Sequence, residues 1–227
     1  MVVYNELVAV TAGAALIGVA VFLSTVVRER RVDGEAWAAF FGLTGLLLFV
    51  LGVHTTVTWP FGGAPCEYAN IAFGQPAAAF GALLLAATVY LWRNRSPVDD
   101  ATSPAPTAAA MRPAAIFVGA LGLGMASLAI AFVRFQLGAA PPEEPISGRV
   151  GHLPWIEALF LGGLWGLVAL GCLLFALALW TERPRLLPWV VRAWFVSGVV
   201  LVLFGAMNFY THIGMYYNLE HGTMHLW

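Results

Sequence analysis

The sequence predicts an all-α membrane protein, a polytopic bundle of about six transmembrane helices that forms a single domain over residues 1–227. Three observations predict it. Apolar residues make up 60% of the chain and charged residues 10%, with a mean hydropathy of +0.82, which is far more apolar than a water-soluble protein needs to be. Six apolar stretches reach the roughly 20 residues that cross a hydrocarbon layer of about 30 Å. Tryptophans and tyrosines gather at the ends of these stretches.

The expected helices cover residues 7–27, 37–59, 71–92, 113–135, 154–180 and 188–211. Residues 1–6, before the first helix, include no basic residue, and no small-residue cleavage site follows. We therefore expect a retained helix rather than a signal peptide. Pro76 is expected to kink the third helix or to start it. Small residues recur at helical spacing in several helices and predict close helix packing. They are Gly42, Gly45 and Gly52; Gly74, Ala78 and Gly81; Gly119 and Gly122; and Gly198 and Gly205.

A linker divides the chain into two halves of three helices each. Residues 94–112 are rich in proline, alanine, serine and threonine, contain Asp99 and Asp100, and predict a mobile cytoplasmic linker. Residues 61–67 resemble residues 137–143, and residues 45–52 resemble residues 198–205. These echoes predict a duplicated helical hairpin, and chance similarity between apolar segments is the alternative.

The arginines predict the orientation in the membrane. All eleven basic residues are arginine, and nine of them flank the first, third and fifth loops, which leaves Arg134 and Arg149 near the opposite face. By the positive-inside rule these three loops are cytoplasmic. We therefore expect a multi-pass protein of the cell (plasma) membrane with both termini, residues 60–70 and residues 136–153 outside.

Composition and motifs exclude several classes of function. The chain has no lysine, which excludes a retinal or pyridoxal Schiff base, a P-loop lysine and a Ser-Lys dyad. The net charge of −1 argues against a nucleic-acid partner and leaves the lipid bilayer as the expected environment. No disulfide is expected between Cys66 and Cys172, because one lies in a loop and the other inside an apolar span. No nucleotide-binding or hydrolase motif is present.

All five histidines fall on the predicted outer side, and several glutamates join them there. Imidazole and carboxylate together suit copper, iron or zinc, and Met215 and Met224 favour copper. The leading hypothesis is a metal or metal-cofactor site for redox chemistry or metal handling, with copper or iron preferred to zinc and haem left open. The proposed ligands are His54, His212, Glu67, His152, Glu157 and His221. His212 shares a helix face with Asn208 and Gly205 and is expected to point inward.

Other interpretations of these residues stay open. The histidines are also comfortable at a membrane interface, and His221 and His225 would be solvated in a disordered tail. Glu6 would complement the dipole of the first helix, Glu143 and Glu144 would lie in a solvated loop, and Cys66 is a weak candidate ligand.

Two further functional classes remain. A transporter or channel would use His54, Glu157 and Asn70 to line a proton-coupled path. A structural subunit would use the small-residue stripes to contact a partner in a membrane complex, or another copy of itself. Whether the protein is an enzyme, and which residues would be catalytic, is left open.

Two segments resemble a known family. The segment His54-Thr-Thr-Val-Thr-Trp-Pro-Phe-Gly-Gly with Asn70-Ile-Ala-Phe-Gly-Gln-Pro, and the segment Tyr210-Thr-His-Ile-Gly, resemble an uncharacterised family of prokaryotic polytopic membrane proteins, the domain of unknown function 981. The resemblance implies a polytopic helical fold and implies no activity or catalytic residue.

Overall fold

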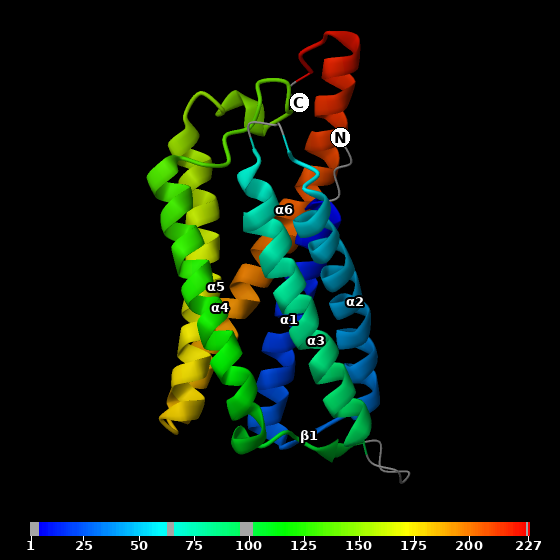
Figure 1. Cartoon of the computed structure of the whole chain (residues 1–227), viewed down its shortest axis with the longest axis vertical. Helices are drawn as coiled ribbons and strands as arrows, with labels where there is room; N and C mark the ends of the chain where they lie inside the picture. The colour runs from blue at the N-terminus through cyan, green and yellow to red at the C-terminus, as the bar shows by residue number, and fades with distance from the viewer. Residues whose placement is uncertain (1–4, 63–65, 96–101, 226) are drawn as a thin grey trace.

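The computed structural model describes residues 5–62, 66–95, 102–225 and 227. Within these ranges it has six helices that are long and apolar enough to cross a membrane, which confirms the predicted fold class (Figure 1). They are α1 (Asn5–Glu29), α2 (Gly34–Thr58), α3 (Gln75–Arg93), α4 (Ala108–Phe135), α5 (Pro154–Trp180) and α6 (Leu187–His221). Two short strands, β1 (Arg31–Val32) and β2 (Ser103–Pro104), pair in antiparallel fashion. A π-helical turn, Asn70–Gly74, precedes α3, and 3-10 turns occupy Ser147–Arg149 and Pro184–Leu186.

Local sequence signals explain where several helices begin. The side chain of Asp33 accepts a hydrogen bond from the Ala36 N–H and caps α2, and Thr107 caps α4 through the Ala110 N–H. Pro76 lies in the first turn of α3, where its missing N–H costs nothing, so it starts the helix proper. Gly222 follows α6 with a φ of 62°, a left-handed conformation that glycine adopts without strain.

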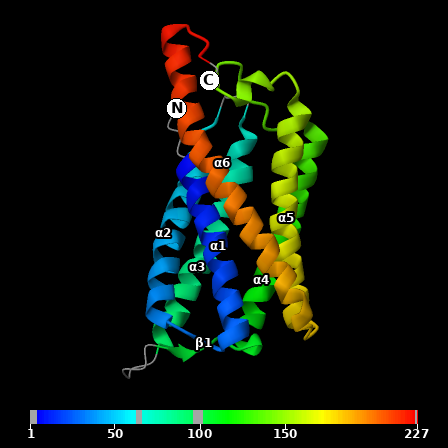
Figure 2. The same ribbon diagram turned by 180° about the vertical axis from the view of Figure 1, so that it is seen from behind.

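The six helices pack as three antiparallel pairs, α2 with α3, α4 with α5 and α1 with α6. In Figure 2, α6 runs diagonally across the bundle, beside α5 near its start and beside α1 near its end. Glycines permit the closest approaches, as their spacing predicts. A Cβ atom on Gly52 would lie 2.7 Å from the Gly74 carbonyl oxygen, and one on Gly198 would lie 2.7 Å from the Gly13 carbonyl oxygen. The first sequence echo relates the hairpins α2–α3 and α4–α5, the second relates α2 to α6, and the duplication stays a prediction.

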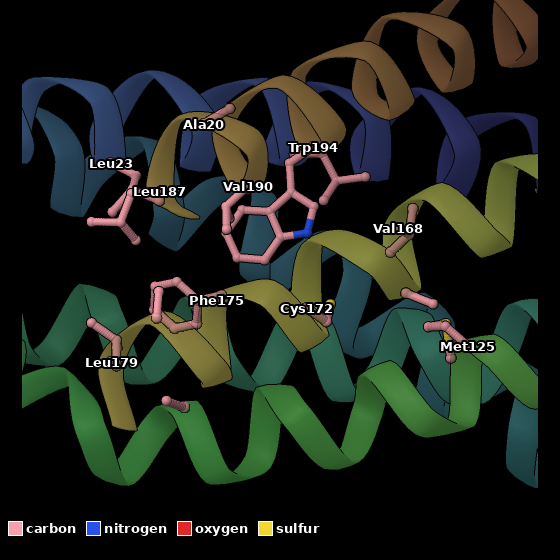
Figure 3. Close-up of a cluster of buried hydrophobic side chains, with 14 residues drawn as sticks. Ala20, Leu23, Met125, Val168, Cys172, Phe175, Leu179, Leu187, Val190 and Trp194 are labelled. Atoms are coloured by element: carbon pink, nitrogen blue, oxygen red, sulfur yellow. The ribbon is translucent and has the colours of Figure 1, made fainter. Parts of the chain in front are cut away.

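Two large apolar clusters form most of the core, and a smaller one lies around Phe132. One lies where α1, α4, α5 and α6 meet and includes Leu23, Met125, Phe175 and Trp194 (Figure 3). The other joins α1, α2 and α3 around residues such as Phe41 and Leu48. Both clusters consist of hydrophobic side chains, so the interior of the bundle is largely apolar.

The bundle has two chemically different ends (Figures 1 and 2). We call the end at which α1 begins and α6 ends the terminal end, and the opposite one the arginine end. At the arginine end Arg95 pairs with Glu35 at 3.1 Å, and Arg112 pairs with Glu182 at 2.5 Å. Ion pairs therefore connect neighbouring segments at the arginine end.

Two predicted boundaries were wrong. Part of the linker predicted over residues 94–112 is ordered, because Ser103–Pro104 pairs with β1 and α4 already begins at Ala108. Asp99 and Asp100 lie outside the described residues. The last helix was predicted to end at residue 211 and continues to His221. It persists because Asn218 is buried and its side chain donates to the carbonyl oxygens of Glu143 and His225, so the helix packs against protein beyond its apolar stretch.

Candidate functional site

A histidine held between two carboxylates is the main polar feature at the terminal end. Nδ1–H of His212, on α6, donates to Oε1 of Glu6, on α1, at 2.5 Å. Its Nε2 lies 3.9 Å from Oε1 of Glu144, in the segment between α4 and α5. Glu6 and Glu144 are each 7% exposed, and the His212 side chain is 14% exposed. Burying charged groups this deeply is costly unless they are paired, so the three residues stabilise one another.

The segment that carries Glu144 is folded onto α6 by specific contacts. Gly214 leaves the space that Pro145 occupies, since a Cβ atom there would lie 2.5 Å from the proline Cγ. One turn further along, Asn218 donates to the Glu143 carbonyl oxygen at 2.8 Å. Glu144 is therefore buried, and the prediction that it lies in a solvated loop was wrong. Prolines on both sides restrict the segment and make the folding-back less costly in entropy.

Glu157 and residues of the loop before α3 complete the polar cluster. Glu157 is close enough to Glu144 for the two charges to repel, and its Oε2 atom is buried without a hydrogen-bond partner among the described residues. Tyr68 lies near Cys66 and Glu157, and its burial raises the pKa of its hydroxyl. Burial also raises the pKa of the Cys66 thiol, which favours its neutral form.

The geometry around His212 decides what the cluster can bind. Glu6 lies at one ring nitrogen and Glu144 faces the other, so the carboxylates lie on opposite sides of the imidazole and do not converge with it on one point. In the part of the chain that the structure describes, no three His, Cys, Asp or Glu side chains are grouped so as to hold a metal ion. The arrangement is suited to holding and exchanging a proton, and a metal ion would have to bind through Nε2.

Of the six predicted ligands, the structure brings only His212 and Glu157 into this cluster. The side chains of His54, His152, Glu67 and His221 are exposed. Nδ1 of His54 lies 3.4 Å from the Thr58 hydroxyl on the same helix. The ring of His221 stacks on Tyr217, at 4.2 Å between centroids.

Asn70, a residue of the predicted transport path, is held by hydrogen bonds within the chain. Asn70 is fully buried, but its side chain accepts from the Phe61 N–H and donates to the Glu67 carbonyl oxygen. Both amide atoms are thus used to hold the turn before α3. The ring of His54 is exposed and lies beside the Thr58 hydroxyl, one turn further along α2.

Sequence reasoning missed two of the three central residues, Glu6 and Glu144. A signal was present for Glu6, because it lies at the start of an apolar span on the same side as His212. A carboxylate at such a position is costly unless it is paired or solvated. The dipole of α1 explains its place equally well from sequence alone. For Glu144 the only signal was the pair of flanking prolines, which also occurs in exposed loops.

A protein-family model described as "Protein of unknown function (DUF981)" matches residues 1–215. No curated protein and no solved structure matches the chain. The matched range contains α1 to α5, most of α6, and every residue of the Glu6–Glu144–His212 cluster.

Proposed function

We propose that this protein, which belongs to the DUF981 family, exchanges protons at the outer face of the cell membrane through His212, in support of redox chemistry or metal handling there. The observation that carries the proposal is the position of His212 between Glu6 and Glu144. Three separate elements supply these residues, so the fold itself must form for the cluster to exist.

Imidazole is the side chain whose ordinary titration lies nearest neutral pH. A proton on His212 gives the cluster one positive charge between two carboxylates, and loss of that proton leaves two buried negative charges facing a neutral ring. The three groups form one electrostatic unit, because a proton gained or lost at one of them changes the field at the other two. Such a unit can accept a proton from one side and release it to another without moving the backbone.

Nitrogen magnetic resonance of histidine-labelled protein in nanodiscs tests this proposal. The His212 ring signals, assigned as those lost in a His212→Gln variant, should change with pH between about 5 and 8. The pH range over which these signals change should differ in Glu6→Gln, whereas the signals of the exposed His221 should respond to pH in the same way in both proteins. A His212 ring that keeps one protonation state throughout this range would refute proton exchange.

Metal handling is a second candidate, favoured by one detail of the geometry. Histidines that bind metals commonly donate their other ring N–H to a carboxylate, as His212 does to Glu6. This leaves Nε2 facing Glu144 at 3.9 Å, too far for a hydrogen bond. Copper or iron would be held by Nε2 and Glu144, with Glu157 nearby, and haem would be an alternative cofactor through the same nitrogen.

Elemental analysis tests this second candidate. The purified protein is expected to contain about one equivalent of copper or iron per chain, and His212→Ala should lose it. His221→Ala is the matched control, because it removes an exposed imidazole from the same helix. Absorption spectra of the same samples would reveal haem. Metal content that is equal in all three proteins would exclude a site at His212.

The proposal also requires the terminal end to face outside, as the arginines predict. Cys66 lies at this end and is partly exposed, whereas Cys172 is buried within α5. A membrane-impermeant maleimide should therefore label intact cells at Cys66 and should not label a Cys66→Ser variant. Because burial raises the pKa of the Cys66 thiol, its thiolate fraction is small at neutral pH, and labelling should accelerate as pH rises. Labelling that needs permeabilised cells would reverse the orientation.

A further inference from the structure

A long internal cavity runs beside the core of the bundle. Its volume is about 400 Å³, which lies in the range of about 300–1,000 Å³ typical of small-molecule sites. It extends from Asn5 and Asn208 at the terminal end to Pro106 and Ala110 at the arginine end. Along α1 its lining runs from Asn5 to Leu23, a length of about 27 Å that approaches the thickness of a bilayer core. The cavity is therefore long and narrow.

The wall of the cavity is apolar and incomplete on one side. Side chains of α1, α5 and α6 form its back, and α3 and α4 form its two edges. These two helices barely touch each other, and Ala86, Tyr90 and Ala114 line the cavity while being exposed. In a membrane an opening between α3 and α4 at this depth faces hydrocarbon. Molecules dissolved in the bilayer can thus enter from the side.

Polar atoms at specific places in the wall have no partner in the described part of the chain. Oδ1 of Asn5 is buried at the terminal end without a hydrogen bond, and the buried Asn208 also lines the cavity at this end. The indole N–H of Trp165, which also lines the cavity, is likewise buried without a partner among the described residues. Buried polar atoms are usually satisfied, so the unpartnered atoms in this wall indicate a bound molecule that supplies hydrogen bonds.

We infer that the cavity binds a single-chain membrane lipid with a neutral, oxygen-bearing head group, such as a long-chain alcohol. The narrow apolar length accepts one extended hydrocarbon chain, and the amides of Asn5 and Asn208 bind a hydroxyl at the terminal end. The lining includes no Arg, Asp, Glu or His, so a charged head group would find no partner there. This inference does not depend on proton exchange at His212, which does not line the cavity.

Binding of tritiated 1-hexadecanol to the purified protein in detergent, followed by scintillation proximity, tests the inference. Saturable binding of about one molecule per chain is expected. Filling the cavity with Ala87→Phe or Ala114→Phe should weaken binding tenfold or more. Ala82→Phe on α3 and Ala120→Phe on α4 are the matched controls, because both residues are exposed and neither lines the cavity. Melting temperatures of all four variants show whether each one folds.

Competition experiments test the head group separately. Unlabelled hexadecanol should displace the probe at lower concentration than hexadecane or palmitate, and Asn208→Leu should remove this preference while still binding the chain. Palmitate that competes as well as hexadecanol would overturn the neutral head group. Absence of saturable binding, or equal binding by folded filling and control variants, would overturn the site itself. If the protein is a dimer and Ala87→Phe makes it monomeric, a second copy of the chain covers the opening, and the lipid site is overturned.

Discussion

Replacing His212 by alanine is expected to lower the free energy of unfolding by about 3–5 kcal/mol, the usual cost of removing one partner from a buried ion pair. The variant leaves the carboxylates of Glu6 and Glu144 buried without the imidazole that lies between them. For a chain of this size each kcal/mol lowers the melting temperature by roughly 2–4 °C. Thermal unfolding in detergent should therefore show a decrease of roughly 6–20 °C.

His221→Ala is the control for this measurement. His221 lies on the same helix, is exposed, and contacts mainly Tyr217, so its loss should change stability by no more than about 0.5 kcal/mol. A double-mutant cycle between Glu6→Gln and His212→Gln should return a coupling energy of about 1–3 kcal/mol, since the two side chains touch. Additive effects would mean that the two side chains do not interact in the folded protein.

Replacing Gly81 by valine is expected to separate α2 from α3 and to cost about 2–4 kcal/mol, near the upper end of what overpacking costs. A Cβ atom on Gly81 would lie 2.7 Å from the Gly45 carbonyl oxygen and 2.8 Å from the Cα atom of Phe49. These are backbone atoms, which cannot rotate away as a side chain can. The helices would have to move apart along most of their contact, so the yield of folded protein and the melting temperature should both fall.

Gly124→Val provides a matched comparison. Gly124 also lies in the middle of a membrane-spanning helix, but a Cβ atom there meets no heavy atom within 4 Å. The intrinsic helix propensities of glycine and valine affect both variants alike, so the difference between them isolates the helix contact. Equal melting temperatures for the two variants would show that α2 and α3 do not pack through Gly81.

The fold was predictable from the sequence because lipid imposes simple rules on backbone and length. Apolar stretches of about 20 residues located all six helices, and the glycine spacing indicated the faces on which they meet. Only the ends were misjudged. Helix α6 continues past its apolar stretch because Asn218 binds the preceding loop, and this tertiary contact has no counterpart in hydropathy.

The candidate site was predictable only in part. The inward orientation of His212 followed from its helix face, and the structure places it beside Glu6. Which carboxylates would reach it depended on how α6 crosses α1 and on how residues 141–145 fold back, and neither follows from composition or periodicity. The same reasoning assigned His54 and His152 to the site because they share its side of the membrane, although a common depth does not bring side chains together around a bundle.

The length of α6 decides how the end of the helix is held. The helix has 35 residues, and His212 lies about 38 Å from its start at 1.5 Å per residue, which exceeds a hydrocarbon thickness of about 30 Å. Because α6 crosses the bundle diagonally, part of this length runs sideways (Figure 2). The turns from His212 onwards make polar contacts with α1 and with the segment before α5, so protein anchors this end of the helix. Loss of either contact should loosen the same stretch of helix.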